Sequence, residues 1–193
     1  MKLPQLILAS ASPRRAELLR QLKLEFKVIP SDATEIFDEQ LSPRELCQLN
    51  AHRKARAIAK KNPDSLVLGA DTLVFFWREI FGKPRDLDEA KQMLAKLQGR
   101  THQVVTGVCL MQLRTHRERI FAVSTDVTFR PLTDGQISGY LSKMNPLDKA
   151  GAYAIQEHGD KIVAEISGSY SNVVGLPVEK LKEELQILQA RET

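Results

Sequence analysis

Residues 6–15 read Leu-Ile-Leu-Ala-Ser-Ala-Ser-Pro-Arg-Arg, an apolar run that leads directly into a helix start. Ser12 is a favourable N-cap, and Pro13 suits the first helical position, where no backbone N–H is needed. Arg14 and Arg15 then place two cations in the first turn, where they oppose the helix dipole. A bound anion would reverse that cost, because free N–H groups at a helix N-terminus favour phosphate. The stretch fits a strand and an anion-binding helix start as well as it fits a capped helix with a solvated basic turn.

Length and composition indicate a globular protein. The chain has 193 residues, of which 42% are hydrophobic and 27% are charged, and this leaves ample chain for a core. We predict a single domain over residues 1–193, or one fold of two lobes. Cys47 and Cys109 lie in separate apolar segments, which predicts reduced core thiols, and the histidines show no zinc spacing.

The first apolar run is interrupted by Pro4 and Gln5, so it does not have the pattern of a signal peptide. No stretch approaches the length of a membrane span, and we expect a cytoplasmic protein without a membrane partner. The formal net charge of +4 raises the question of nucleic-acid binding. The charge is spread over several predicted helices, without interleaved aromatic residues or a basic tail. A small phosphate-bearing substrate explains it as well, so we expect no stable nucleic-acid complex; the sequence leaves a homodimer open.

Helical and alternating patterns follow one another along the chain. The predicted strands are a first one from residue 6 and then 25–30, 66–70, 73–76, 79–81, 102–113, 120–130, 162–166 and 170–174. The predicted helices start at Ser12, Ser42, Asp86, Thr133 or Asp134, and Pro177. This is a mixed α/β fold, and its long hairpins exclude a purely parallel sheet.

A lysine interrupts the apolar face of the long helix that follows Ser42. The face consists of Leu46, Cys47, Ala51, Ala57 and Ile58, and Lys54 lies in its middle. A lysine at such a position costs free energy unless its ammonium reaches water or an anion. Snorkelling at the rim of the core is the structural alternative. If Lys54 binds phosphate, Lys54→Met should lower turnover and leave the thermal stability equal or higher.

Two further stretches carry chemistry. The apolar strand 66–70 ends in Asp71 and Thr72, at the point where open α/β sheets bind ligands. A carboxylate there could bind a hard divalent cation or take a proton from water, although an aspartate that caps a turn is the commoner situation. Lys83 lies in a second basic loop, residues 82–86, whose structural alternative is a helix cap with solvated neighbours.

Six stretches together resemble the successive signatures of the Maf family of nucleotide pyrophosphatases. They are residues 10–15 (SASPRR), 69–72 (GADT), 82–86 (GKPRD), 125–130 (TDVTFR), 148–156 (DKAGAYAIQ) and 168–177 (GSYSNVVGLP). They follow the family's order and spacing over nearly the whole chain. Each match alone would be weak, and the set is specific.

The resemblance implies a two-lobed α/β fold with a mixed sheet, similar to inosine triphosphate pyrophosphatases, with an active-site cleft between the lobes. It also implies hydrolysis of a nucleoside triphosphate to the monophosphate and pyrophosphate with a divalent cation, Mg²⁺ or Mn²⁺. By position, Asp71 matches the proposed proton acceptor and Glu35 matches an acidic residue near the metal. The phosphate-contacting positions are matched by Ser10, Ser12, Arg14, Arg15, Lys54 and Lys83.

Three positions resemble one branch of the family. Arg14, Thr72 and Gln156 match the branch that acts on dTTP and UTP, whereas the branch acting on 7-methyl-GTP has Trp, Gln and Glu there. An amide such as Gln156 can match the N3–H and the neighbouring carbonyl of uracil or thymine. Because an amide can flip, cytosine is not excluded. The resemblance therefore predicts a dTTP/UTP pyrophosphatase, which could extend to modified pyrimidine nucleotides. The alternative is a regulatory protein of cell division that binds a nucleotide or nucleic acid without turnover.

Two positions depart from the family's pattern. The acidic loop reads Asp32-Ala33-Thr34-Glu35 instead of two adjacent acids, so Asp32 or Glu35 could meet the metal. Arg53 precedes Lys54 where an acidic residue is often found, and it adds positive charge near the phosphates. The role of Asp71, as metal ligand or proton acceptor or both, is also open.

Overall fold

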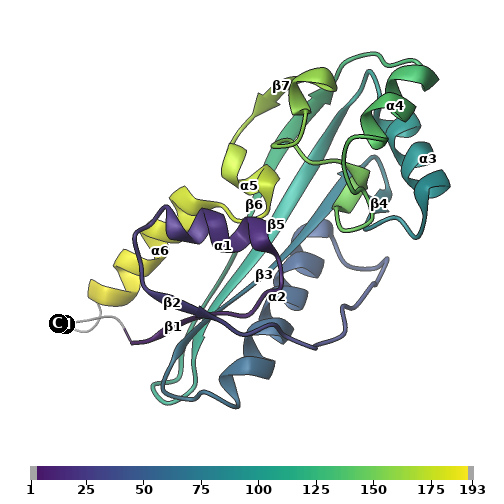
Figure 1. Ribbon diagram of the computed structural model, residues 1–193. Coiled ribbons are helices and arrows are strands. Elements are labelled where there is room, and N and C mark those ends of the chain that lie inside the picture. The colour runs from purple at the N-terminus through teal and green to yellow at the C-terminus, as the bar shows by residue number, and fades with distance from the viewer. Residues whose placement is uncertain (1–3, 191–193) are drawn as a thin grey trace. The chain divides into compact units, whose positions relative to one another are not determined.

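The computed structural model describes residues 4–190, so residues 1–3 and 191–193 of the predicted single domain lie outside it. The protein is α/β, as predicted (Figure 1). The strands are β1 (Leu6–Leu8), β2 (Phe26–Val28), β3 (Leu66–Phe76), β4 (Glu79–Phe81), β5 (Thr101–Gln112), β6 (Arg117–Phe129) and β7 (Val163–Ser167). The helices are α1 (Pro13–Arg20), α2 (Pro43–Ala59), α3 (Leu87–Leu97), α4 (Asp134–Leu141), α5 (Tyr170–Val174) and α6 (Val178–Ala190), with 3₁₀ turns η1 (Ala150–Ala152) and η2 (Gly159–Lys161).

The strands within the described residues form a mixed sheet in the order β2-β1-β3-β5-β6-β7, and β4 pairs with β3. Strand β1 is parallel to both of its neighbours, with Leu6 opposite Phe26 in β2 and opposite Leu66 in β3. Strands β3 and β4 are antiparallel, and so are β6 and β7. The combination of parallel and antiparallel pairs confirms the predicted mixed sheet.

The chain forms two compact units, as the two-lobed prediction anticipates. Unit 1 consists of the chain up to Asp71, Thr106–Val123 and the residues from Gly175 onward. Unit 2 consists of Thr72–Val105 and Ser124–Val174. Strands β3, β5 and β6 therefore each contribute residues to both units.

The core of unit 1 brings helix α2 against the strands. Ala51, Ala55 and Ile58 of α2 pack with Ile7 of β1 and Val67 of β3. Figure 1 shows α2 behind these strands. The contact is so close that a Cβ atom on Gly69 would lie 2.2 Å from the carbonyl oxygen of Ala51. Small residues on both elements therefore set the distance between α2 and β3.

Unit 2 has its own core beneath helices α3 and α4, which lie side by side in Figure 1. Leu94 and Leu97 of α3 and Ile137 and Tyr140 of α4 are buried there. The buried ring of Phe129 in β6 belongs to the same cluster. Each unit thus buries apolar side chains independently.

Helix starts agree with the capping residues of the sequence. Ser12 accepts a hydrogen bond from the Arg15 amide, and Ser42 forms a capping box with Glu45. Asp86 caps α3. Thr133, not Asp134, caps α4, which settles the alternative that the sequence left open. Local side-chain-to-backbone bonds explain why these starts could be predicted.

The predicted strands 66–70 and 73–76 form one continuous strand, β3, so Asp71 lies within a strand and not at its end. The predicted strand 170–174 is wrong, because these residues form the short helix α5. The hydroxyl oxygen of Ser169 accepts a hydrogen bond from the Asn172 amide at 3.1 Å, and the Ser169 carbonyl accepts from the Val173 amide. This serine cap starts a helix despite the strand preference of Val173 and Val174. The Asn172 side chain then donates to the Val104 carbonyl and the Thr125 hydroxyl, both at 3.0 Å, and this fixes the helix in unit 2.

Cys47 and Cys109 are buried and free, which confirms the predicted core thiols. Burial raises the pKa of the Cys109 thiol well above its usual range, so this sulfur stays protonated. Among residues 4–190, no helix combines the length and apolar character that a membrane span requires.

Candidate functional site

Lys54 connects two acidic residues in unit 1. Its ammonium lies 2.7 Å from Asp71 Oδ1 and 2.6 Å from Glu35 Oε1. Asp71 is only 4% exposed, whereas Glu35 lies on the surface. The lysine on the apolar face of α2 is therefore compensated by carboxylates from β3 and from the acidic loop. The expectation that Lys54→Met removes an uncompensated charge is therefore wrong in its premise, because the charge is paired.

Asn50 is a site residue that the sequence analysis missed. It lies one turn before Lys54 on α2 and is 2% exposed. Its Nδ2 donates to Asp71 Oδ2 at 3.3 Å and to the Ile36 carbonyl at 3.0 Å, while its Oδ1 accepts from the Ile36 amide at 2.8 Å. One amide thus orients the catalytic candidate Asp71 and holds the acidic loop. Its signal in the sequence was a polar residue four positions before Lys54, within the same apolar stripe.

The start of α1 contributes a second cationic group. Arg15 Nη1 donates to the Ser10 hydroxyl at 3.2 Å, and its Nε donates to the Gly175 carbonyl at 2.9 Å. The Ser10 hydroxyl also accepts from the Ser12 amide at 3.2 Å. These bonds fix the guanidinium against the helix start, with Arg14 half-buried beside it.

The two groups influence one another through their charges. Burial lowers the pKa of the Arg15 guanidinium from its usual value, and the negative charges of Asp71 and Glu35 act in the opposite direction. Arg14 adds a repulsive charge that also lowers it. Unit 1 therefore concentrates the cations of Arg14, Arg15 and Lys54 around two carboxylates. Such a mixed set attracts a polyanion and retains acceptors for a cation or a proton.

The structure also bears on the two departures from the family pattern. Arg53 Nε donates to the Thr34 carbonyl at 3.3 Å, so it holds the acidic loop and its charge stays exposed. Glu35, and not Asp32, is bonded to Lys54. Of the two loop acids, Glu35 is therefore the one placed beside Asp71 through a shared partner.

Thr72, Lys83 and Gln156 belong to unit 2. Thr72 is half-buried in β3, whereas Lys83 and Gln156 are exposed. Within this unit the Gly151 amide donates to the Gly82 carbonyl at 3.0 Å, which joins the loop of Lys83 to the segment that carries Gln156. The predicted site residues are thus grouped as Ser10, Ser12, Arg14, Arg15, Glu35, Lys54 and Asp71 in unit 1 and Thr72, Lys83 and Gln156 in unit 2. The predicted cleft between lobes stays a prediction.

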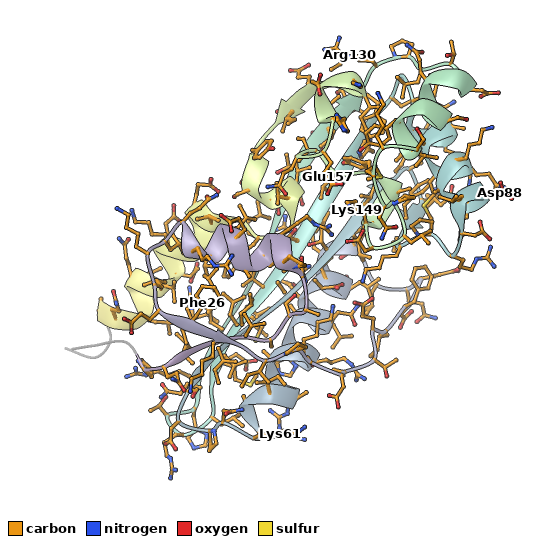
Figure 2. The ribbon with its side chains drawn as sticks, in the orientation of Figure 1. Phe26, Lys61, Asp88, Arg130, Lys149 and Glu157 are labelled. Carbon is orange, nitrogen blue, oxygen red and sulfur yellow. The ribbon has the colours of Figure 1, made fainter. Side chains whose placement is uncertain are left out.

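A buried lysine holds the segment that carries Gln156. Lys149 Nζ lies 2.7 Å from the Asn145 carbonyl, 2.8 Å from Asp148 Oδ1 and 3.4 Å from Glu157 Oε1. Figure 2 shows Lys149 and Glu157 next to one another. The Tyr140 hydroxyl accepts from the Ala154 amide at 3.0 Å and fixes the middle of the segment. Gln156, directly before Glu157, is therefore presented to solvent from an anchored segment.

The donor set of unit 1 is compatible with a divalent cation. No group of three or more His, Cys, Asp or Glu side chains arranged for a metal occurs in residues 4–190. Mg²⁺ is commonly held by one or two carboxylates together with substrate phosphates and water. Asp71 and Glu35 supply two such carboxylates, since an oxygen of each lies within hydrogen-bonding distance of the same ammonium. These residues fit a cation that a phosphate ligand helps to hold.

Comparison with known proteins gives a consistent result. The sequence profile of the family described as Maf-like protein matches residues 5–188. A protein of Akkermansia muciniphila named dTTP/UTP pyrophosphatase is 47% identical over 176 residues, which cover 91% of this chain and 92% of the relative. A protein of Symbiobacterium thermophilum with the same name is 48% identical over 91% of this chain and 90% of the relative. A protein of Bacillus velezensis, also named dTTP/UTP pyrophosphatase, is 47% identical over 91% of this chain and 92% of the relative.

Proposed function

Because this chain belongs to the Maf-like protein family, we propose that it hydrolyses dTTP and UTP to the nucleoside monophosphate and pyrophosphate. The three relatives described above, all named dTTP/UTP pyrophosphatase, match it over nine-tenths of its length. The observation that carries the proposal is the contact of Lys54 with Asp71 and Glu35 beside Arg15. It combines phosphate-binding cations with carboxylates that can serve the hydrolytic step.

Lys54 is suited to binding a phosphate without leaving its present partners. An ammonium has three N–H donors. In the described part of the chain, Lys54 donates to Glu35 and Asp71. The third N–H would bind a phosphate oxygen, and Arg15 would add a bidentate group from α1. We propose that Ser10, Ser12 and Arg14 at the same helix start, and Lys83 in unit 2, bind the remaining phosphate oxygens.

Asp71 and Glu35 would hold a divalent cation, Mg²⁺ or Mn²⁺. When bound, the cation neutralises charge that develops on the phosphate oxygens. Asn50 and Lys54 both donate to the Asp71 carboxylate and orient it. That orientation is what either role of Asp71 requires.

In the proposed reaction a water oxygen bonds to the α-phosphorus and the bond from this phosphorus to the bridging oxygen breaks. Pyrophosphate leaves with that electron pair. The proton released by the attacking water goes to the Asp71 carboxylate. The cations at the α1 start and Lys54 hold the triphosphate so that attacking and leaving oxygens are in line.

The experiment that tests this activity is pyrophosphate release by the full chain from UTP, dTTP, CTP and GTP, with Mg²⁺ or Mn²⁺. We expect the kcat/KM for UTP and dTTP to be at least about tenfold above the kcat/KM for GTP. One unmatched hydrogen bond to the base lowers kcat/KM by roughly this factor. Saturable nucleotide binding without pyrophosphate release would instead favour the regulatory binding protein. Equal turnover of all four would contradict the substrate preference.

Gln156→Glu tests the proposed base recognition. The change replaces an amide donor by an acceptor, so it loses the bond to the O4 carbonyl and adds a negative charge beside it. Turnover of UTP and dTTP should fall about 10- to 100-fold, because an unmatched hydrogen bond to a base that covers Gln156 costs roughly 1–3 kcal/mol. GTP, which offers donors at N1 and N2, should lose less. A uniform change in kcat/KM for all four nucleotides would show that Gln156 does not read the base.

The cellular location, the oligomeric state and the lack of nucleic-acid binding stay predictions. We propose a cytoplasmic location, supported by two buried cysteines that are free. A homodimer is testable by sedimentation of the full chain. The predicted lack of a stable nucleic-acid complex is testable by a mobility-shift titration at physiological salt.

A further inference from the structure

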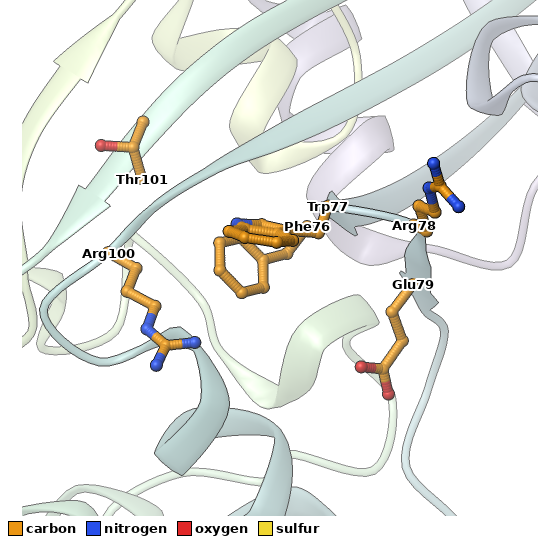
Figure 3. A pocket seen from close by; sticks show the side chains of 6 residues that line it. All are labelled: Phe76, Trp77, Arg78, Glu79, Arg100 and Thr101. Atoms are coloured by element: carbon orange, nitrogen blue, oxygen red, sulfur yellow. The ribbon is translucent and has the colours of Figure 1, made fainter.

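A hollow of about 930 Å³ lies in unit 2, outside the residues assigned to the reaction. It is lined by the tip of the β3–β4 hairpin and by the start of β5, with Phe76, Trp77, Arg78, Glu79, Arg100 and Thr101 (Figure 3). Its volume is within the range of about 300–1,000 Å³ that is typical of small-molecule sites. The aromatic pair lies at its centre, with Arg100 on one side and Arg78 and Glu79 on the other.

Trp77 presents its ring to solvent from an unusual backbone position. It is 83% exposed and has a φ of 59°, in a two-residue hairpin loop between paired Phe76 and Glu79. Glycine or asparagine is the usual choice at such a position, and a bulky residue is rare. The Phe76 ring lies beside it, with centroids 6.2 Å apart and planes tilted by 54°. The hairpin therefore holds a large, unburied aromatic face beside a second ring.

The charges around these rings are predominantly positive. The Arg100 guanidinium lies 5.5 Å from the Phe76 ring centroid, a cation–π contact that holds it at the hollow. Glu79 is paired with Lys96, so its charge is already compensated. Within residues 4–190, neither Arg78 nor Arg100 has a carboxylate partner. Two uncompensated guanidinium groups therefore flank the aromatic pair.

We propose that this hollow is a second nucleotide site, which binds a mononucleotide with its base on Trp77 and its phosphate on Arg100. A base stacks on an aromatic face whatever its identity, and a guanidinium binds a phosphate in a bidentate way. The lining comes from one hairpin, from Arg100 and from Thr101 at the start of β5, without the long basic groove that follows a nucleic-acid strand. A mononucleotide therefore fits better than a single-stranded nucleic acid.

The chain provides its own probe, because Trp77 is its only tryptophan. We would titrate the full chain with UMP, which carries base and phosphate and lacks the anhydride bond of the proposed reaction, and follow tryptophan fluorescence. Saturable quenching is expected. Uridine and ribose 5-phosphate should each bind at least about tenfold more weakly, since each lacks one of the two contacts. Equal quenching by ribose 5-phosphate and UMP would overturn the stacking of the base.

Matched variants separate this site from the candidate active site. Arg100→Gln should weaken UMP binding about tenfold, and Arg78→Gln, on the other side of the rings, should weaken it less. Both variants should leave kcat/KM for UTP unchanged. Arg15→Gln, at the candidate active site, should leave the quenching unchanged even if UTP turnover is lost or was never present. Quenching lost in Arg15→Gln, or kept in the double Arg78→Gln/Arg100→Gln variant, would overturn the proposal. Binding of an eight-residue oligouridylate more than tenfold tighter than UMP would overturn it in favour of nucleic acid.

Discussion

At the scale of single residues, Lys54 balances the negative charges of two carboxylates in unit 1. Its ammonium bonds to Asp71 and Glu35, and its side chain is 13% exposed. An unpaired carboxylate at the depth of Asp71 would be expensive, so the lysine has a structural role besides the phosphate contact that we propose. The same interaction therefore supports both the fold and the proposed chemistry, and the two roles can be separated by mutation.

For Lys54→Met we expect loss of turnover together with a fall of about 3 kcal/mol in the free energy of unfolding, because Asp71 loses its counter-ion. Adding Asp71→Asn should restore most of that stability and none of the activity. Lys60→Met, at the exposed C-cap of the same helix, is the matched control and should change neither. Urea unfolding and pyrophosphate release measure the two effects. A Lys54→Met protein as stable as wild type would contradict the ion-pair role.

For Asp71→Asn alone we expect turnover to fall by on the order of 10²-fold or more, because Asn neither accepts the proton nor binds a hard cation well. Raising the Mn²⁺ concentration distinguishes the two roles of Asp71. Partial recovery would point to cation binding, and no recovery to proton transfer. Asp64→Asn, which changes an exposed partner of Arg114, is the control. Near wild-type turnover in a folded Asp71→Asn protein would refute both roles.

At the scale of elements, the contact between α2 and β3 positions the reacting groups. Helix α2 carries Asn50 and Lys54, and β3 carries Asp71. Gly69 lies two residues before Asp71 in β3. A Cβ atom on Gly69 would lie 2.2 Å from the Ala51 carbonyl oxygen and 2.7 Å from the Ala55 nitrogen. The absence of a side chain on one residue therefore allows the 2.7 Å bond between Lys54 and Asp71.

Gly69→Ala should move α2 away from β3. We expect the free energy of unfolding to fall by about 1–3 kcal/mol and kcat/KM to fall by roughly 10- to 100-fold, because displacements near 1 Å cost that much in a positioned site. Gly139→Ala in α4 is the matched control, since nothing lies within 4 Å of its Cβ position. It should raise stability by about 0.5–1 kcal/mol and leave turnover unchanged. Equal behaviour of the two variants would contradict the packing argument.

At the scale of the whole molecule, the two units carry different tasks. The grouped carboxylates and cations belong to unit 1, whereas Gln156 and the proposed second nucleotide site belong to unit 2. The core of unit 2 contains an aromatic cluster, in which His102 contacts Phe129 and Tyr153 edge to face. His102 is 2% exposed, and its Nε2 lies 2.8 Å from the Tyr153 hydroxyl.

This histidine makes the stability of the molecule depend on pH. Burial lowers the pKa of His102 from 6.5 to about 4. Between these values an unfolded chain binds a proton that the folded chain does not, so stability is complete above about pH 6.5 and falls as the pH decreases toward 4. The loss should be on the order of 3 kcal/mol.

The measurement is urea unfolding at a series of pH values, for wild type and for a His102→Phe/Tyr153→Phe variant. Replacing both partners removes the hydrogen bond without leaving one polar group unpaired, so the variant should fold. Its stability should decline less steeply than that of wild type between pH 6.5 and 4. Parallel curves would show that His102 does not account for the decline.

The sequence alone determined the features that depend on neighbours a few residues apart. The starts of α1, α2, α3 and α4 follow from caps whose bonds span three residues, which is why they could be predicted. The error at α5 is also local, since the Ser169 cap lies directly before residues 170–174 in the sequence. The family signatures and the position of Lys54 within an apolar stripe were likewise visible without a structure.

Only the tertiary structure decided what Lys54 and Asn50 do. Lys54 meets Glu35 and Asp71 across 19 and 17 residues of chain, and Asn50 meets Asp71 across 21. No periodicity or capping pattern predicts such pairs, because they form only when α2 packs on β3 at the distance that Gly69 permits. The hollow around Trp77 is similar. The sequence shows a tryptophan, but only the hairpin geometry exposes its ring, and only the fold places Arg100, directly before β5, beside it. Charges and rings that are distant along the chain become neighbours only when the sheet forms. Helical and strand periodicities relate only residues a few positions apart, so they do not predict these contacts.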